Sequence, residues 1–310
     1  MQQFRHNIDL HCHTNISDGR LSPEELLQLA QQNGIELLAI SDHDTLQGYR
    51  VAKPIAEEYK IKLIPAAEFS CQHQKMNIHL VALNVDPDSE VMKNFENQQE
   101  NRRNERAHKI ANKLYKAIHR DISENFSSDE AFYEYVQTLA GEGVVGRPHF
   151  AQALVEQGIV KDAEQAFKKF LGSGKAGDVK LFWPDMGDAI EAIHASGGKA
   201  ILAHPLKYNM TRSKLTRLID DFWNMDGDAL ELISSRQTKD DTGWMIRQID
   251  KRDLSASVGS DFHAANRWSD LGAYSAIPNV QLHWVHEDIK FTESQSHLAR
   301  PPAVISKEVI

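Results

Sequence analysis

Short apolar runs alternate along the chain with longer stretches of helical periodicity. The apolar runs lie at residues 8–13, 36–41, 62–68, 77–85, 198–205, 229–235 and 255–263. Their length and their polar or glycine-containing borders predict buried strands. Helices are predicted at 23–33, 45–59, 186–196, 211–225 and 239–252. Such alternation is typical of parallel β/α units in an α/β fold, and seven strands favour a barrel, incomplete or distorted, over a doubly wound sheet.

The segment between the fourth and fifth runs departs from this pattern. It contains no convincing strand, and residues 91–118 have the charge density and the periodicity of one long amphipathic helix. Shorter helices are predicted at 128–140 and 147–158. We interpret this part of the chain as a helical insertion into the barrel.

The predicted domain boundaries follow from this interruption. Residues 1–87 and 185–277 would form the barrel, and residues 88–184 would form the helical insertion, packed over one end of the barrel as a substrate lid. Residues 278–310 are polar and contain prolines, and we treat them as a C-terminal tail without a predicted structure.

The composition is that of a globular protein with a sizeable core. Hydrophobic residues make up 41% of the chain and charged residues 25%, both close to the globular average. The formal net charge of −9 argues against a large basic surface that grips duplex nucleic acid. It leaves room for a nucleotide or a short nucleic acid held at a cluster of bound cations.

Cysteine content and the N-terminus indicate a cytoplasmic protein. Cys12 and Cys71 are the only cysteines, and neither belongs to a C-x-x-C pair, so no disulfide framework is expected. The first residues lack the apolar core of a signal peptide, and no run of about 18 apolar residues occurs. We expect a soluble protein without membrane contact, and we predict no stable protein partner.

Histidines and carboxylates gather where the predicted strands end. In parallel β/α folds the active site forms beyond these C-terminal ends. Six of the seven runs supply such residues: His11 and His13, Asp42 and His43, Glu68, His79, His204, and Asp261 with His263. His79 taken alone would be a core histidine, but residues from six strands that converge on one edge predict a common site.

The first pair indicates the chemistry of this site. Residues i and i+2 of a strand face the same side, so the imidazoles of His11 and His13 project together, either as a hydrogen-bonded pair or around a cation. Imidazoles and carboxylates without thiolates suit Mn²⁺, Fe²⁺, Zn²⁺ or Mg²⁺. About nine candidate ligands suffice for two or three ions, and clustered divalent ions favour hydrolysis of a phosphate ester.

The order and spacing of these motifs resemble one known family. DLHCHTNISDG, AISDHDT, PAAEFS, IHLVALNVD, AILAHP and GSDFH are similar to motifs of the PHP (polymerase and histidinol phosphatase) family. QQENRRNERAHKI, GRPHFAQALV and FKKFLGSGKAGDV resemble its RNase AM branch, which contains 5′→3′ exoribonucleases and 3′,5′-nucleoside bisphosphate phosphatases. The resemblance covers about residues 1–277 and implies a distorted (β/α)₇ barrel with a trinuclear metal centre.

The resemblance also implies which residues hold the ions. One ion would be held by His11, His13, Glu68 and Asp261, a second by Glu68, His79 and His204, and a third by Asp18, His43 and His263. Mn²⁺ is the expected metal, and Fe²⁺, Zn²⁺ and Mg²⁺ are alternatives that accept the same ligands. Asp18, His43, Glu68, His204, Asp261 and His263 are also expected to act in catalysis. Asp42 would orient an imidazole.

Four basic residues are candidates for binding substrate phosphates. Arg147 and His149 in GRPHF resemble the phosphate-holding residues of the branch, and an arginine can grip a phosphate with two hydrogen bonds. The alternative is that this segment only begins a helix. Lys175 in GSGKAG and Lys207 in HPLKYN are further candidates. The family often has arginine where Lys207 stands, and a lysine offers a single charge instead of a fork.

The expected activity is that of a metal-dependent phosphoesterase. It would remove the 3′-phosphate of 3′,5′-nucleoside bisphosphates and shorten 5′-monophosphorylated RNA or short oligonucleotides from the 5′ end, through a metal-activated hydroxide. One alternative is a small-metabolite phosphatase of the histidinol-phosphate type, which the large insertion disfavours. A second is a non-catalytic metal- or nucleotide-binding module, which the complete ligand set disfavours. An amidohydrolase would need a metal-bridging lysine that the fourth strand lacks.

Overall fold

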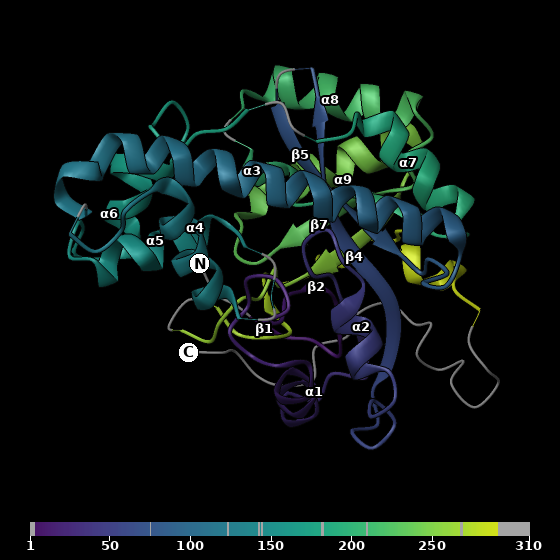
Figure 1. The fold of residues 1–310 in the computed structure, drawn as a ribbon. Helices are drawn as coiled ribbons and strands as arrows, with labels where there is room; N and C mark the ends of the chain where they lie inside the picture. Colours follow the sequence, from purple (N-terminus) through teal and green to yellow (C-terminus); the bar gives the residue numbers. More distant parts are fainter. Residues whose placement is uncertain are drawn as a thin grey trace. The chain divides into compact units, whose positions relative to one another are not determined.

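The chain forms two compact units in the computed structural model. The structure describes residues 4–290, apart from 75, 123, 142, 144, 181–182, 209 and 267–268. The barrel unit comprises Met1–Glu96 and Pro184–Ile310, and the helical unit comprises Asn97–Trp183. Figure 1 follows the chain through its elements. Residues 291–310 of the predicted tail lie outside the described residues.

Seven strands form the wall of the barrel unit in the order in which they occur in the chain. They are β2 (Ile8–Cys12), β3 (Leu37–Ile40), β4 (Lys62–His73), β5 (Met76–Leu83), β6 (Lys199–Leu202), β7 (Ala229–Ser234) and β8 (Ser255–Gly259). After β8, the N–H of Asp261 donates to the carbonyl of His11 (2.8 Å), and the N–H of His13 donates to the carbonyl of Phe262 (2.8 Å). These bonds join the last strand to the first, so the predicted barrel is confirmed and is nearly closed.

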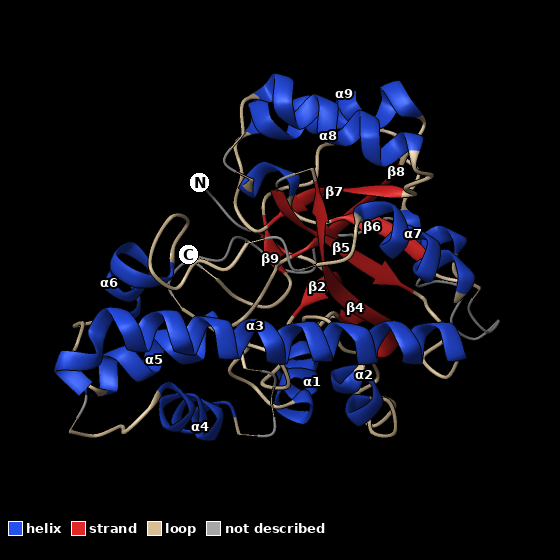
Figure 2. Cartoon of the chain, turned by 45° about the horizontal axis from the view of Figure 1, so that its top comes forward, coloured by secondary structure: helices blue, strands red, loops and turns tan. Residues whose placement is uncertain are grey.

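Helices pack around the outside of this wall (Figure 2). They are α1 (Pro23–Gln32), α2 (Gln47–Ala52), α7 (Met186–Ala195), α8 (Arg212–Asn224) and α9 (Lys239–Arg252). Two 3₁₀ helices, η2 (Pro205–Lys207) and η3 (Val285–Asp288), and a small ladder of β1 (Phe4–Arg5) with β9 (Ala273–Tyr274) belong to the same unit. The start of α1 is set by its sequence, because Pro23 takes the first position and Ser22 and Glu25 form a reciprocal capping box.

One strand runs against the predicted direction. The β/α alternation predicts parallel neighbours throughout, but β5 is antiparallel to both β4 and β6. β4 extends to His73 and β5 begins at Met76, so only two residues connect them. A parallel pair needs a crossover of about a dozen residues or more. The two strands therefore form a hairpin, and this reversal is the distortion of the barrel.

The prediction for α2 was also wrong. The sequence pattern predicts a helix over 45–59, whereas α2 spans Gln47–Ala52 and is followed by turns. Pro54 has no N–H with which to continue the hydrogen bonds of the helix. The proline therefore ends the helix within two turns.

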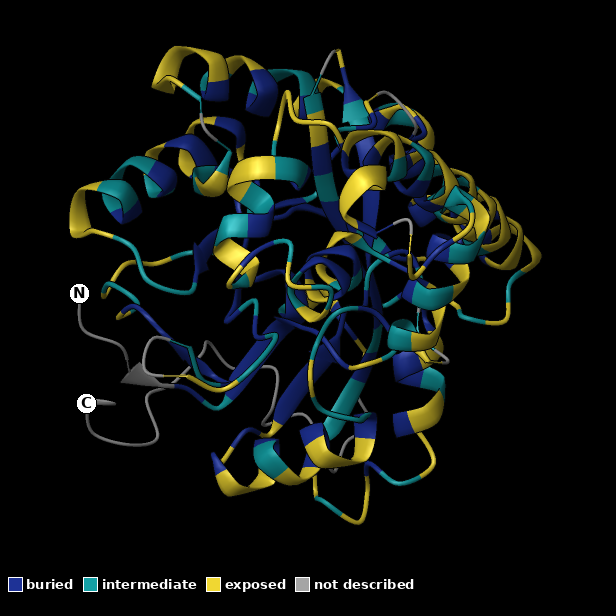
Figure 3. Ribbon diagram, turned by 60° about the vertical axis from the view of Figure 1, so that its left-hand side comes forward, coloured by how far each residue is buried: buried dark blue, intermediate teal, exposed yellow. Residues whose placement is uncertain are grey.

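The interior of the barrel has an apolar layer beneath a polar one. Alternate residues of a strand face the same side of the sheet, and on the inward side they form one apolar cluster: Ile8, Leu10, Leu37, Ala39, Ile64, Ala66, Val81, Leu83, Ile201, Ala203 and Ala229. Val285 of η3 and the following Ile289 belong to the same cluster, so part of the predicted tail fills the barrel. Figure 3 shows the strands buried and the surrounding helices exposed along one side.

The helical unit has a core of its own. α3 (Glu90–Ile122) begins in the barrel unit, and α4 (Asp129–Ala140), α5 (Arg147–Glu156), α6 (Ala163–Ala166) and the π-helix η1 (Phe167–Leu171) follow. Leu114 of α3, Phe132 of α4 and Phe150 of α5 belong to one buried cluster. The described part of this unit contains no strand, as the sequence predicts. Nowhere among the described residues does a helix have the length and apolarity needed to cross a membrane.

Candidate metal centre

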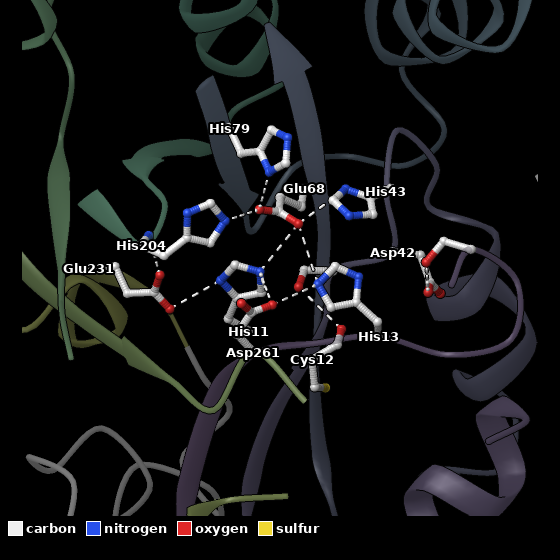
Figure 4. Close-up of polar contacts among 12 residues, drawn as sticks. His11, Cys12, His13, Asp42, His43, Glu68, His79, His204, Glu231 and Asp261 are labelled. Atoms are coloured by element: carbon white, nitrogen blue, oxygen red, sulfur yellow. Dashed lines mark hydrogen bonds and ion pairs between the residues drawn. The ribbon is translucent and has the colours of Figure 1, made fainter. Parts of the chain in front are cut away.

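His11 and His13 enter the barrel side by side from the end of β2 (Figure 4). A β-bulge between Asp9 and Cys12 shifts the register of β2 against β3. His11 therefore lies on the inward side directly after the inward Leu10, instead of alternating with it. Both imidazoles are buried, and their ring centroids are 5.2 Å apart. Cys12 packs instead in a cluster with residues of α1.

Glu68 lies at the centre of the site. It follows Ala66 on the inward side of β4, and 1% of its surface is exposed. Five imidazoles surround its carboxylate. Oε1 lies 2.9 Å from His79 Nδ1 and 2.8 Å from His204 Nε2. Oε2 lies 3.4 Å from His11 Nε2, 3.3 Å from His13 Nε2 and 3.1 Å from His43 Nδ1. Burial alone would raise the pKa of Glu68, but the nearby histidines hold it well below its usual range.

His79 reaches the site because β5 runs in reverse. The inward residues of β4 proceed from the apolar layer to Glu68, whereas β5 passes His79 first and then continues to Val81 and Leu83 in the apolar layer. The backbone N–H of His79 donates to the hydroxyl of Tyr208 (2.9 Å). In a parallel β5, His79 would lie at the opposite end of the barrel from Glu68.

Asp261 completes the inner part of the site beside β8. Its Oδ1 lies 3.5 Å from His11 Nε2 and 3.3 Å from His13 Nε2. The ammonium of Lys207, which is 44% exposed, forms an ion pair with Oδ2. Burial alone would raise the pKa of Asp261, but His11, His13 and Lys207 lower it well below its usual range. Lys207, a predicted substrate-binding residue, thus lies at the rim of this centre.

Asp18, His43 and His263 form the outer part of the site. Asp18 Oδ1 lies 3.3 Å from His263 Nε2, and Asp18 Oδ2 lies 3.7 Å from His43 Nε2. Burial opposes ionisation of Asp18, yet His43 and His263 hold its pKa well below the usual range. Burial lowers the pKa of His43 to about 3, whereas Asp18 outweighs burial at His263 and raises its pKa to about 9.

The donor atoms of these residues gather in four groups, and within each group all of them lie within 4.8 Å of one another. The groups are His13–Asp18–His43–His263, His11–Glu68–His204, His11–His13–Asp261 and His43–Glu68–His79. Together they contain every residue predicted to be a metal ligand. Several buried ring nitrogens have no hydrogen-bond partner in the described structure: His11 Nε2, His13 Nδ1 and Nε2, His43 Nδ1 and His204 Nδ1. Imidazole nitrogens that face carboxylates in this way fit divalent metal ions.

The grouping differs from the assignment that the family resemblance implies: the group of His11, His13 and Asp261 lacks Glu68, and His13 joins Asp18, His43 and His263. The expected trio of Glu68, His79 and His204 is divided between two groups, one of which includes His43 and the other His11. Glu68 is the member that both groups share. Which ligands hold which ion stays a prediction.

Comparison with known proteins gives the family. Residues 9–178 match the family model of the PHP domain. The chain belongs to the PHP family. It is 42% identical over 264 residues to a 5′-3′ exoribonuclease of Haemophilus influenzae, covering 85% of this chain and 92% of that protein. It is 33% identical over 276 residues to a 3′,5′-nucleoside bisphosphate phosphatase of Chromobacterium violaceum, covering 88% and 93%.

A solved structure has a similar fold. An amidohydrolase from Chromobacterium violaceum, with bound sulfate and no metal, has a TM-score of 0.78 to this chain at 32% identity, and 88% of this chain and 92% of that chain are covered. The predicted family and the predicted class of enzyme, a hydrolase, are confirmed by these relatives.

Two supporting carboxylates of this PHP centre escaped the sequence analysis, Asp9 and Glu231. Asp9 accepts hydrogen bonds from Ser260 N (2.9 Å), Ser260 Oγ (2.6 Å), Gly272 N (2.8 Å) and His11 N (3.3 Å). Burial outweighs these bonds and raises the pKa of Asp9 to about 6. The signal in the sequence was an acidic residue within a short apolar run, because such a residue must have partners once buried.

The structure shows which groups Asp42 binds, and its role in orienting an imidazole stays a prediction. Its oxygens accept hydrogen bonds from Thr14 N (2.7 Å), Thr14 Oγ1 (2.6 Å) and Ser17 Oγ (2.7 Å). Asp42 therefore holds the loop that leads from His13 to Asp18.

The other predicted substrate-binding residues belong to the helical unit. Arg147 opens α5, and its guanidinium lies 5.9 Å from the ring centroid of Phe167. The Nδ1 of His149 accepts a hydrogen bond from Gly146 N (3.0 Å). Lys175 is exposed in the loop after η1. The role of these three residues in substrate binding stays a prediction.

Proposed function

We propose that this PHP protein hydrolyses the ester at the 3′ oxygen of 5′-phosphorylated nucleotides. From 3′,5′-nucleoside bisphosphates it would release the 3′-phosphate, and from 5′-monophosphorylated RNA or short oligonucleotides it would release nucleotides at the 5′ end. The names of relatives at 42% and 33% identity support both substrates. The observation that carries the proposal is the buried carboxylate of Glu68 with its five surrounding imidazoles.

The ligand set suits a centre of three divalent ions. Mn²⁺ is the metal we propose, and Fe²⁺, Zn²⁺ or Mg²⁺ would accept the same ligands. The residues that would hold the ions are His11, His13, Asp18, His43, Glu68, His79, His204, Asp261 and His263. When bound, the ions supply Lewis acidity toward the phosphoryl oxygens and a nucleophile at neutral pH.

Side chains at the rim would bind the substrate. The Lys207 ammonium, kept beside the centre by Asp261, would offset negative charge on the phosphoryl oxygens. Arg147 and His149 lie in the first turn of α5, at the positive end of its helix dipole, which favours an anion. We propose that they and Lys175 hold the 5′-phosphate, with the helical unit as a lid. Because a 5′-phosphate would anchor both substrate types, one site would serve two reactions.

The cellular location is proposed on chemical grounds. Cys12 and Cys71 are both free and buried, and free thiols persist in a reducing compartment. We therefore propose that the protein acts in the cytoplasm.

The test uses matched RNA substrates. Mn²⁺-loaded protein is given a short 3′-labelled RNA with a 5′-monophosphate, the same RNA with a 5′-hydroxyl, and adenosine 3′,5′-bisphosphate. We expect stepwise shortening of the phosphorylated RNA alone and phosphate release from the bisphosphate. If metal-loaded protein left both phosphorylated substrates intact, the proposed function would be wrong. Release of phosphate from histidinol phosphate instead would identify a metabolite phosphatase.

Variants separate the roles of the two units. Asp261→Asn should abolish both reactions, because it removes a carboxylate from the centre. Arg147→Ala should raise KM for 5′-phosphorylated substrates by about 10-fold or more, the value of a charged hydrogen bond. Arg120→Ala, an exposed arginine on α3 of the same unit, is the matched control and should leave KM unchanged. Equal KM values for both variants would show that Arg147 does not bind the 5′-phosphate.

A further inference from the structure

Glu231 is a buried carboxylate that contacts the metal centre without belonging to any of its donor groups. It lies on β7, two residues after the inward Ala229, and 2% of its surface is exposed. Its Oε1 lies 3.1 Å from His11 Nδ1, and its Oε2 accepts a hydrogen bond from the backbone N–H of His204 at 2.5 Å. Figure 4 shows Glu231 on the far side of His11 and His204 from Glu68.

The contact with His11 decides which ring nitrogen faces the centre. A carboxylate accepts hydrogen bonds, so His11 Nδ1 keeps its proton and donates a hydrogen bond to Glu231. In the neutral imidazole the lone pair then lies on Nε2, which has no hydrogen bond within the described structure and lies 3.4 Å from Glu68 Oε2. Metal-binding imidazoles commonly have their second nitrogen fixed by a carboxylate in this way.

The contact with His204 fixes its backbone. His204 has a φ of +32°, in the left-handed region that residues other than glycine rarely adopt. It is the residue at which β6 gives way to η2, and its Nε2 lies 2.8 Å from Glu68 Oε1. The hydrogen bond from its N–H to Glu231 holds this unusual conformation and so directs the imidazole toward Glu68.

We propose that Glu231 is a positioning residue of the metal centre, which fixes the Nδ1-protonated tautomer of His11 and the backbone of His204. One side chain thus orients two ligands that approach Glu68 from different strands. The inference rests on the proposed metal centre and is independent of which phosphate ester is the substrate.

The need for a carboxylate follows from its two partners. His11 Nδ1–H and the His204 N–H are both donors, and each points to a different oxygen of Glu231. A glutamine has the same shape but only one acceptor oxygen, so its amide group would place N–H against one of the two donors. Glu231→Gln therefore removes one of the two acceptor oxygens with little change in side-chain volume.

Asp228 offers a matched control on the segment just before β7. Its Oδ2 lies 2.7 Å from His194 Nε2 and accepts a hydrogen bond from Ala200 N at 2.8 Å. Like Glu231, Asp228 thus contacts an imidazole and a backbone N–H, and its Oδ1 accepts from Lys199 Nζ at 2.9 Å, but His194 lies on α7 outside the donor groups. Asp228→Asn has the same chemical change and should leave metal binding unaltered.

The first experiment measures metal binding without turnover. Wild type, Glu231→Gln and Asp228→Asn are stripped by chelation, checked for folding by circular dichroism, and titrated with Mn²⁺ while free Mn²⁺ is read by electron paramagnetic resonance. We expect Glu231→Gln to bind at least one ion 10- to 100-fold more weakly, and Asp228→Asn to match wild type. Equal affinities of wild type and folded Glu231→Gln would overturn the proposal.

A second measurement does not depend on the folding of Glu231→Gln. In metal-free protein with ¹⁵N-labelled histidine, the His11 resonances are assigned by their loss in His11→Gln. We expect the neutral form of His11 to be protonated at Nδ1, and a neutral form protonated at Nε2 would overturn the proposal even if Glu231→Gln failed to fold. Failure of the wild type to bind Mn²⁺, Fe²⁺, Zn²⁺ or Mg²⁺ would contradict the proposed function instead, because the tautomer is read without metal.

Discussion

Replacement of Asp42 by alanine should detach the loop that carries Asp18 from the barrel. Asp42 is 1% exposed and accepts three hydrogen bonds of 2.6 to 2.7 Å, two from Thr14 and one from Ser17. Thr14 and Ser17 are both buried, so Asp42→Ala would leave these three donor groups without an acceptor. This loss is expected to destabilise the folded state.

The magnitude follows from the number of bonds. At about 1 to 1.5 kcal/mol net for each bond, three bonds are worth roughly 3 to 4.5 kcal/mol. Burial raises the pKa of Asp42 despite the bonds from Thr14 and Ser17, which means that desolvation of the carboxylate offsets part of this gain. We therefore expect Asp42→Ala to lower the free energy of unfolding by about 2 to 4 kcal/mol.

An asparagine at the same position is the matched variant. Its amide oxygen can still accept from Thr14 N and Ser17 Oγ, which both donate to Oδ1, and the Thr14 hydroxyl can rotate to accept from the amide group. Asp42→Asn should therefore cost only about 1 kcal/mol. The comparison separates the loss of hydrogen bonds from the loss of charge.

Urea unfolding of the metal-free proteins measures both losses. Removing metal excludes the contribution of ion binding to stability, and an unchanged m-value would show that the unfolded state is the same. We expect wild type to be the most stable, Asp42→Asn to be less stable and Asp42→Ala to be the least stable. We also expect Asp42→Ala to have a lower kcat, because Asp18 is displaced. A loss below about 0.5 kcal/mol for Asp42→Ala, the size of an ordinary surface substitution, would refute the reasoning.

Two further predictions concern the surroundings of the centre. Gly48→Ala should destabilise the protein by about 1 to 3 kcal/mol, although alanine favours helices. The reason is that the added Cβ would lie 1.9 Å from Asp42 Oδ2. A gain in stability measured by urea unfolding would contradict this prediction. Asp9 has a folded pKa of about 6 against an ordinary 3.8, so folding favours its protonated form and stability falls as pH rises between these values. That fall amounts to roughly 3 kcal/mol, and it should be absent from Asp9→Asn when unfolding of metal-free protein is compared at pH 4 and 7. Equal pH slopes in both proteins would show that Asp9 titrates normally.

The wall of the barrel was predictable because its strands are short, apolar and separated by clear helical patterns. The direction of β5 was not, because an apolar run such as 77–85 reads the same in either direction. The evidence for the hairpin lies in how far β4 continues, to His73, beyond the predicted end at 68. Prolonged pairing with β5 carries the strand across polar residues that a sequence pattern assigns to a loop.

The ligands of the centre were predictable for a chemical reason. Histidines and carboxylates at the ends of several strands have few structural uses in common, so their convergence indicates metal binding. Their grouping was less predictable, because it depends on distances of a few ångströms between side chains from different strands. Glu68 contacts imidazoles with both oxygens and therefore belongs to two donor groups at once.

The supporting carboxylates escaped prediction because their positions depend on irregularities of the strands. Asp9 and Glu231 both lie at the start of a β-bulge, in β2 between Asp9 and Cys12 and in β7 between Glu231 and Ile233. A bulge interrupts the alternation of inward and outward residues and leaves backbone groups without their usual partners. The bulge in β2 brings His11 to the inward side after Leu10. The Asp9 carboxylate accepts a hydrogen bond from the backbone N–H of His11. The sequence thus predicts which residues are ligands, but the bulges determine how their side chains are oriented. Each bulge has an acidic residue at its first position, and this residue holds a ligand in place.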